Sequence, residues 1–412
     1  MLRTYFLGDS TMKTALVSLG VVLLSLGCGA SGGPDKPSNT AGMNGGGNGS
    51  GGKAGGAGGA GAGTSNTSGS AQGGSSAGNS TAGSGGNAGG NSGGGAGGGA
   101  GGSGGGPATG FQCPAGPYEA PTLTGLTPTR VAGVPPADAF NNNNNDFTNI
   151  EGDVWFEGAL YVSEIGGGTN PPPSRILKIT ADDQVSIVMP DSGSNGLAFD
   201  AMGQFYGALH KDGSVSKLDL VAKTATPVVS MFMTARFGSP NDLTFHTNGT
   251  LYFTDPSWQA PTPNPQSDTR AYWVAPGGQP QAIAGASNNP NGITLSKSQD
   301  FLYVAGQNPI KRYPVMADGS LGAGADFGTG TGGLDGMVID CADNLYAAAG
   351  ADGVKVFDKT GAPLGTIAVS GLQATNVAFG GTDHKTLYIS GQGSGDQKGV
   401  FKVAMNVPGY PY

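Results

Sequence analysis

Six polar residues recur along the chain, and each opens the same short phrase. The phrase begins with an acid or an amide, usually followed by glycine, and continues as an apolar strand, a polar turn and a second strand with an aromatic residue. The leading residues are 44, 46, 50, 44 and 41 positions apart. They are Glu151, Asn195, Asn241, Asn291, Asp335 and Asn376.

This set of side chains offers oxygen atoms as ligands and almost nothing else. Oxygen-only ligation suits a hard cation such as Ca²⁺. The three histidines, His210, His246 and His384, have no ligand spacing to one another, which argues against a zinc site. Asn-Gly and Asp-Gly pairs also form ordinary turns. The competing interpretation is therefore that the phrases mark turns alone.

The elements that must position these residues are short strands. Between consecutive phrases lies a second alternating hairpin, for example residues 175–180 with 185–188, so each unit supplies about four strands. No segment of 111–412 has a sustained helical period. Six units with a period in the forties predict an all-β, six-bladed β-propeller with four short antiparallel strands per blade. Equivalent positions of the blades then lie on a ring, and the six leading residues face one mouth of the central channel.

The composition divides the chain into unequal parts. Of the 80 glycines among 412 residues, 37 lie between residues 29 and 110, without a collagen-like period of three. Residues 28–110 are therefore predicted to be a disordered Gly/Ser/Ala-rich linker that acts as a tether. Residues 111–412 are the predicted propeller. The net charge of −8, with no basic run, excludes nucleic acid as an expected partner.

The N-terminus carries an export signal. An apolar run at 15–24 has the length of a signal-peptide core, and it leads into Ser25-Leu26-Gly27-Cys28. This ending resembles a bacterial lipobox, so residues 1–27 are predicted to be a lipoprotein signal peptide and Cys28 to be lipidated. We expect an exported, outer-membrane or cell-surface lipoprotein of a Gram-negative bacterium, which contacts the membrane only through that lipid. The alternative is an ordinary cleaved signal.

Two further cysteines lie in the predicted propeller. In an exported protein, Cys113 and Cys341 form a possible disulfide that would tie the incoming chain to a late blade. The alternative is a pair of buried thiols.

The phrases resemble the SMP-30/gluconolactonase family through most of 147–405. The strongest stretch is 236–258, with its Ser-Pro-Asn-Asp and Tyr-Phe-Thr-Asp-Pro pieces. Residues 289–292 (Asn-Pro-Asn-Gly) and 334–337 (Leu-Asp-Gly-Met) are also similar to the family. The segment 150–155 fits as well, although Asp153 stands where the family more often has proline.

The resemblance implies one divalent cation at the channel mouth and the hydrolysis of a lactone, a sugar lactone or a similar cyclic ester. The expected ion is Ca²⁺, with Zn²⁺, Mn²⁺ and Mg²⁺ as alternatives. Carried over by motif, the metal ligands are Glu151, Asn241, Asn291 and Asp335. Asp335 is also the expected general base, and its alternative role is that of a plain ligand.

Other residues have more open roles. Arg236 and Asn195 are predicted to bind the substrate, although Arg236 could be a surface arginine. Trp258 and His210 either line the mouth or serve packing. Asp242 is a candidate for a second, structural cation of the kind found in paraoxonase relatives, and Asp255 is expected to fix a turn. The loops 166–173 and 257–269 are expected to set specificity.

Three classes of function compete. The first is a monomeric, metal-dependent lactonase. The second is a lipid-tethered binding module whose structural cation supports capture of a sugar, peptide or protein, since a fold does not dictate a function. The third is another six-bladed propeller, of the NHL-repeat or strictosidine-synthase-like kind. The Ser-Pro-Asn-Asp phrase and the Glu151 start argue against that third class.

Overall fold

The computed structural model describes residues 111–136, 147–286 and 288–411. Those residues form strands, turns and one short 3₁₀ helix, η1 (Gly395–Gln397), and they contain no α-helix. Accordingly, no helix within this described part is long and apolar enough to cross a membrane. The predicted signal peptide (1–27) and linker (28–110) lie outside the described residues.

Six four-stranded antiparallel sheets make up the fold, each running outward from an inner strand. Blade one contains β2 (Phe147–Phe156), β3 (Ala159–Gly166), β4 (Ser174–Thr180) and β5 (Val185–Met189). Blade two contains β6 (Ser194–Phe199), β7 (Phe205–Leu209), β8 (Ser214–Asp219) and β9 (Thr224–Val229). Blade three contains β12 (Leu243–Phe245), β13 (Leu251–Asp255), β14 (Arg270–Val274) and β15 (Gln281–Ala282). Between blades two and three, β10 (Met231–Phe232) and β11 (Ala235–Arg236) form a small hairpin.

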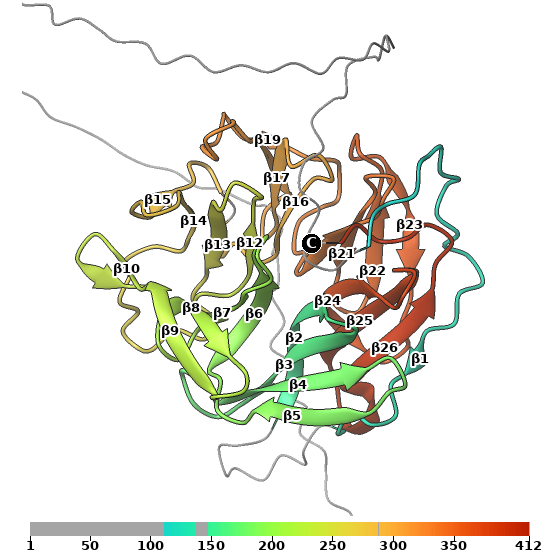
Figure 1. The fold of residues 1–412 in the computed structure, drawn as a ribbon, viewed down its shortest axis with the longest axis horizontal. Helices are drawn as coiled ribbons and strands as arrows, with labels where there is room; N and C mark the ends of the chain where they lie inside the picture. Colours follow the sequence, from blue (N-terminus) through green and yellow to red (C-terminus); the bar gives the residue numbers. More distant parts are fainter. Residues whose placement is uncertain (1–110, 137–146, 287, 412) are drawn as a thin grey trace, which may run out of the picture. The chain divides into compact units, whose positions relative to one another are not determined.

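The second half of the ring repeats this order. Blade four contains β16 (Ile293–Leu295), β17 (Phe301–Val304), β18 (Lys311–Pro314) and β19 (Ala325–Asp326). Blade five contains β20 (Met337–Ile339), β21 (Leu345–Ala348), β22 (Val354–Phe357) and β23 (Pro363–Ile367). Blade six contains β24 (Gln373–Gly380), β25 (Thr386–Gln392), β26 (Gly399–Ala404) and β1 (Thr129–Arg130). The predicted six-bladed β-propeller is confirmed (Figure 1).

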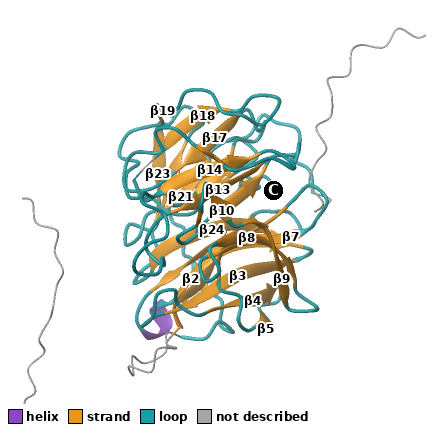
Figure 2. Cartoon of the chain, turned by 90° about the vertical axis from the view of Figure 1, so that its left-hand side faces the viewer, coloured by secondary structure: helices purple, strands orange, loops and turns teal. Residues whose placement is uncertain are grey.

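Two segments that lie far apart in the sequence pair with each other to close the ring. The outermost strand of blade six is β1, from the N-terminal side, and it pairs with β26 through Thr129–Lys402 and Arg130–Phe401. A view at right angles shows the strands of the blades joined by turns and loops, with η1 as the one helical turn among the described residues (Figure 2). The ring is therefore closed by hydrogen bonds within one blade.

The hydrophobic core is divided among the interfaces between blades. Six clusters of buried side chains each draw on two neighbouring blades, so every blade packs on both faces. The aromatic residue that ends each phrase enters this core on the second strand. These residues are Tyr161, Tyr206, Tyr252, Tyr303, Tyr346 and Tyr388, all of them buried. The repeated phrase is thus a packing unit as well as a carrier of polar residues.

A disulfide fastens the N-terminal segment to blade five. Cys113 and Cys341 are bonded, with their Cα atoms 5.5 Å apart, which settles the open question in favour of the bridge. Nearby, the Cys341 amide donates to the carbonyl of Pro408, and Phe111 stacks on the ring of His384 with 4.2 Å between centroids. The N-terminal and C-terminal segments therefore meet on one side of the propeller, and the C-terminal end lies near the centre of the ring in Figure 1.

Candidate metal centre and active site

The six leading residues lie where the innermost strands begin. Glu151, Asn195 and Asn376 are inside β2, β6 and β24, and each lies at or beside a β-bulge in the pairing with the second strand. Asn241, Asn291 and Asp335 each stand two residues before an inner strand. All are buried except Asp335, which keeps partial exposure. The expectation that all six face one mouth is wrong for Asn376, which lines a separate pocket with Asp242, whereas Thr375 of the same blade lines the pocket of Asn291 and Asp335.

The glycine after the leading residue allows neighbouring blades to approach. A Cβ added to Gly152, whose φ is +67°, would lie 2.1 Å from the carbonyl oxygen of Asn195. A Cβ on Gly292 would lie 2.2 Å from the carbonyl oxygen of Asp335. The same relation recurs between Gly196 and Asn241. In blade six it differs, because a Cβ on Gly336 would meet the side chain of Asn376, and the Gly336 amide donates to the carbonyl of Thr375. These glycines are thus contact points between blades, and the simple turn interpretation does not account for them.

The two acids of the ring influence each other. Burial, followed by the nearby charge of Asp335, raises the pKa of Glu151 well above its ordinary value, although the Asn149 amide partly offsets this by donating to Glu151 Oε1 at 3.2 Å. Burial, followed by the charge of Asp242, likewise raises the pKa of Asp335. Blades one and five therefore bring two carboxylates together in a place where ionising both is costly. A cation between them would remove that cost.

Two amides of the predicted ligand set have firmly held backbones. The Asn241 amide donates to Thr254 at 2.9 Å, and the Thr254 hydroxyl donates to the Asn291 carbonyl at 2.7 Å. Asn291 Oδ1 is buried and accepts no hydrogen bond from the described residues. A buried, unpaired carbonyl oxygen costs about 1–3 kcal/mol unless a ligand uses it. Its position next to Asp335 in one pocket makes it suitable as a ligand atom.

The donor chemistry fits a hard cation. Within the described ranges, no three His, Cys, Asp or Glu side chains gather closely enough to hold a metal by themselves. The ring instead combines the carboxylates of Glu151 and Asp335 with amide oxygens, and Asn291 offers an oxygen without a partner. Such an all-oxygen set is what Ca²⁺ and related ions prefer.

The loop before Asn241 is held by Asp255. Its carboxylate accepts hydrogen bonds from the backbone amides of Gly238, at 3.1 Å, and Ser239, at 2.6 Å. Burial raises the pKa of Asp255 to about 6, although those amides lower it in part. Asp255 therefore fixes the loop that leads into Asn241, rather than only the turn before Pro256 that was expected of it.

The predicted substrate-binding residues have different surroundings. Asn195 is buried, and its Nδ2 lies 3.5 Å from Oε1 of Gln259, which brings the 257–269 loop over this part of the ring. Arg236 is in the β10–β11 hairpin, where its guanidinium donates to the carbonyl of Lys211 at 3.4 Å. Arg236 does not line the pocket that contains Asn291 and Asp335. Its role with a substrate stays a prediction.

His210 and Trp258, whose roles the sequence left open, differ in their burial. His210 is fully buried, with Nε2 2.9 Å from the carbonyl of Pro172, and burial lowers its pKa to about 4. Trp258 is 42% exposed and lines the same pocket as Asn291. His210 is therefore a packing residue, whereas Trp258 is part of the mouth.

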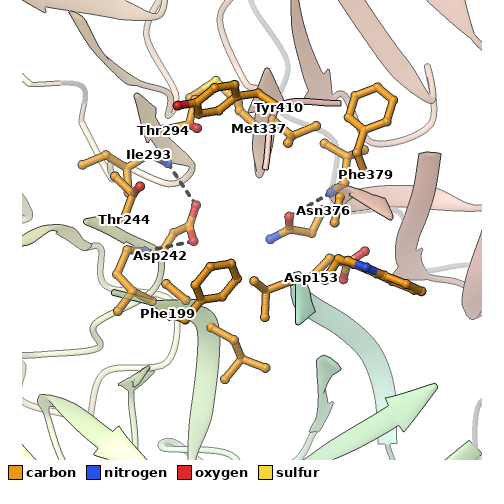
Figure 3. A pocket seen from close by; sticks show the side chains of 18 of the residues that line it. Asp153, Phe199, Asp242, Thr244, Ile293, Thr294, Met337, Asn376, Phe379 and Tyr410 are labelled. Carbon is orange, nitrogen blue, oxygen red and sulfur yellow. Dashed lines mark hydrogen bonds between the residues drawn. The ribbon is translucent and has the colours of Figure 1, made fainter. Parts of the chain in front are cut away.

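A second pocket, of about 80 Å³, lies in the channel between the inner strands of the six blades (Figure 3). There Asp242 accepts the amides of Leu243 at 2.9 Å and Ile293 at 3.0 Å, and its side chain points toward that of Asn376. Burial raises the pKa of Asp242 to about 7. Tyr410, from the C-terminal segment, closes one side. Asp242 thus links blades three and four, and a second cation beside it stays a hypothesis.

Sequence reasoning missed several residues of these pockets. Asp153 lines the channel pocket, and its carboxyl oxygens are buried without a hydrogen bond of ordinary geometry among the described residues. Its departure from the family's proline was the available signal. Gln307, Gln373 and Gln392 line the mouth pocket. They lie outside the positions that the repeat aligns, so the phrase could not identify them.

Comparisons with known proteins identify relatives of this chain. Residues 150–392 match the SMP-30/Gluconolactonase/LRE-like region. A gluconolactonase of Zymomonas mobilis subsp. mobilis is 30% identical over 276 residues, covering 58% of this chain and 75% of that protein. A solved gluconolactonase of Xanthomonas campestris is 25% identical with a TM-score of 0.55, covering 68% of this chain and 98% of that one.

A calcium-binding regucalcin of Agrobacterium tumefaciens has a TM-score of 0.53 at 19% identity, and it covers 68% of this chain and 95% of its own. That likeness concerns the fold. Together with the family match over 150–392, these findings place the chain: it belongs to the SMP-30/gluconolactonase/LRE-like family.

Proposed function

We propose that the protein is a lactonase that hydrolyses a sugar lactone or a similar cyclic ester with the help of one bound divalent cation. The observation that carries the proposal is that Asn291 and Asp335 line one pocket, with Asn291 Oδ1 left without a partner among the described residues. The charge of Asp335 also acts on the buried carboxyl group of Glu151. Family membership and the 30% identical gluconolactonase support the same reaction.

The residues proposed to hold the cation are Glu151, Asn241, Asn291 and Asp335, and Ca²⁺ is the expected ion. When bound, a cation of this class would polarise the lactone carbonyl and stabilise the negative charge that develops on its oxygen. Two carboxylates close together in a buried site are a favourable arrangement for such an ion, because each raises the cost of ionising the other.

Asp335 is the proposed general base. Its carboxylate accepts a proton from water as the water oxygen bonds to the carbonyl carbon, and the same proton passes to the ring oxygen when the ester C–O bond breaks. The product is the open hydroxy acid. Asp335 is partly exposed and lines the mouth pocket, where water can reach its carboxylate. Asn195 would orient the substrate, with Arg236 reaching only a substrate that extends toward blade two.

The test is acid release from glucono-δ-lactone by the purified protein, with EDTA and with added Ca²⁺. Asp335→Asn should lower kcat by about 10²–10⁴-fold, the usual contribution of a positioned base. Asp326→Asn, an exposed carboxylate of β19 paired with Lys311, is the matched control and should leave kcat unchanged. A protein whose thermal melting responds to Ca²⁺ but which opens no lactone would instead be a binding module with a structural cation.

A further inference from the structure

The mouth pocket beside the proposed cation site has an unusual wall of amides. It has a volume of about 160 Å³ and extends over blades four, five and six from Asn291 and Asp335. Its exposed polar side chains are Gln307, Gln373 and Gln392, and Trp258 closes one side. We call these four residues the amide rim. Much of the remaining wall is glycine, which leaves room for a ligand to approach the backbone.

The amides of the rim are available for a ligand. Among the described residues, no side-chain hydrogen bond involves Gln307, Gln373 or Gln392. Gln266 makes a contrast, because its Nε2 donates to the carbonyls of Ala235 and Arg236, each at 3.0 Å, and stabilises the β10–β11 hairpin. The rim glutamines have no comparable structural task.

The rim is held on fixed backbone. Gln373 and Gln392 are cross-strand partners at the ends of β24 and β25. The Gln307 amide donates to the carbonyl of Asn288 at 3.2 Å. Ser257, next to Trp258, donates to Asn289 Oδ1 from its amide at 3.1 Å and from its hydroxyl at 3.0 Å. Side chains on anchored backbone lose less freedom when they bind, so they are suited to recognition.

The chemistry of the rim selects among lactones. A carboxamide both donates and accepts, which matches a hydroxyl group, and an indole face packs against the C–H face of a ring. Among the described residues that line the pocket there is no lysine, arginine or histidine, and Asp335 is the one acid. The rim side chains themselves are uncharged, so they match neutral hydroxyl groups. The volume is also well below the roughly 300–1,000 Å³ of pockets for drug-sized ligands, so a single small ring fits best.

We propose that the amide rim reads the hydroxyl groups of an uncharged, polyhydroxylated lactone ring, with Trp258 packing on its face. This inference rests on the proposed function. Gln307, Gln373 and Gln392 determine specificity in this scheme, whereas Glu151 and Asp335 carry out the chemistry. The hydroxyl-bearing carbons of the ring then lie against the rim, and the carbonyl lies toward the proposed cation site.

Binding and turnover separate this inference from the proposed function. Calorimetry with Ca²⁺ present would compare gluconolactam, a cyclic amide with the same hydroxyls, with δ-valerolactam, which has none. Replacing one rim glutamine by leucine should weaken the binding of gluconolactam by about 2–12-fold, which corresponds to the loss of one hydrogen bond. The three variants are Gln307→Leu, Gln373→Leu and Gln392→Leu. Trp258→Ala should weaken it by a similar factor. The change in δ-valerolactam binding should be smaller for every glutamine variant.

Gln281→Leu is the matched control, since Gln281 is an exposed glutamine on β15 at the outer edge of blade three. It should bind both lactams like the wild type. Equal binding of the two lactams by the wild type, or rim variants that bind gluconolactam as the wild type does, would overturn the inference. Loss of lactone turnover with hydroxyl-selective binding retained would overturn the proposed function and leave the amide rim in place.

Discussion

The disulfide should contribute a large share of the free energy of unfolding, because it lowers the conformational entropy of the unfolded chain. Cys113 and Cys341 are 228 residues apart. Closing a loop of that length removes about 18 cal/mol/K of chain entropy, or about 5 kcal/mol at 25 °C. In the folded protein β1 is also held by its pairing with β26, so we expect the native ring to keep its outer strand without the bridge. We therefore expect Cys113→Ser to cost about 3–5 kcal/mol.

The assay is equilibrium unfolding in urea, followed by intrinsic fluorescence, for wild type and Cys113→Ser with and without reductant. Cys113 is the better residue to replace, because Cys341 is buried and its amide holds the C-terminal segment. The variant should also have a larger dependence of free energy on denaturant, since its unfolded state is less compact. Reductant should lower the wild-type midpoint to that of the variant and leave the variant unchanged. A fully reduced wild type with an unchanged midpoint would refute the loop-entropy argument.

Two further predictions concern residues close to the cation site. Gly292→Ala would place a Cβ 2.2 Å from the Asp335 carbonyl, so it should destabilise the protein by about 1–3 kcal/mol and weaken Ca²⁺ binding in calorimetry. Gly278→Ala, whose Cβ would meet nothing closer than 3.1 Å, is the control, and equal melting of the two variants would contradict the packing argument. Burial raises the pKa of Asp153 from 3.8 to about 7, so its contribution to stability is complete below about pH 4 and is lost as the pH rises through 7. Asp153→Asn should therefore raise the melting temperature at pH 8 in EDTA and reduce its decline between pH 5 and pH 8; an unchanged slope would show that Asp153 does not titrate there.

The repeated phrase predicted the fold because it reports packing. Its tyrosine enters an interface between blades, and its leading residue enters the channel, so one pattern encodes both the ring and its polar lining. The glycine of the phrase was ambiguous in the sequence. A turn and a close approach of neighbouring backbones both require a residue without a side chain, and only the position of Asp335 against Gly292 distinguishes them.

The rest of the site depends on neighbours that no local pattern encodes. Gln373 and Gln392 come together through strand pairing, and Gln307 joins them from another blade. Arg236 shows the converse, because it is close to the phrase in sequence but its side chain lies elsewhere. It precedes the Ser-Pro-Asn-Asp phrase closely in sequence, yet the hairpin carries its guanidinium to the carbonyl of Lys211. Proximity along the chain could not decide which polar groups share the mouth.

The pairing of β1 with β26 also sets the order in which parts of the protein can fold during synthesis. Thr129 pairs with Lys402, so blade six cannot be completed until residue 402 has left the ribosome. Until then the facing apolar surfaces of blades one and six have no partner, and pairing over such a separation is slow. Glu151 lies on β2, the inner strand of blade one, which packs against β24 of blade six. High-affinity cation binding should therefore appear last. A nascent chain that stops before β26 would contain every proposed ligand in its sequence without assembling them in space.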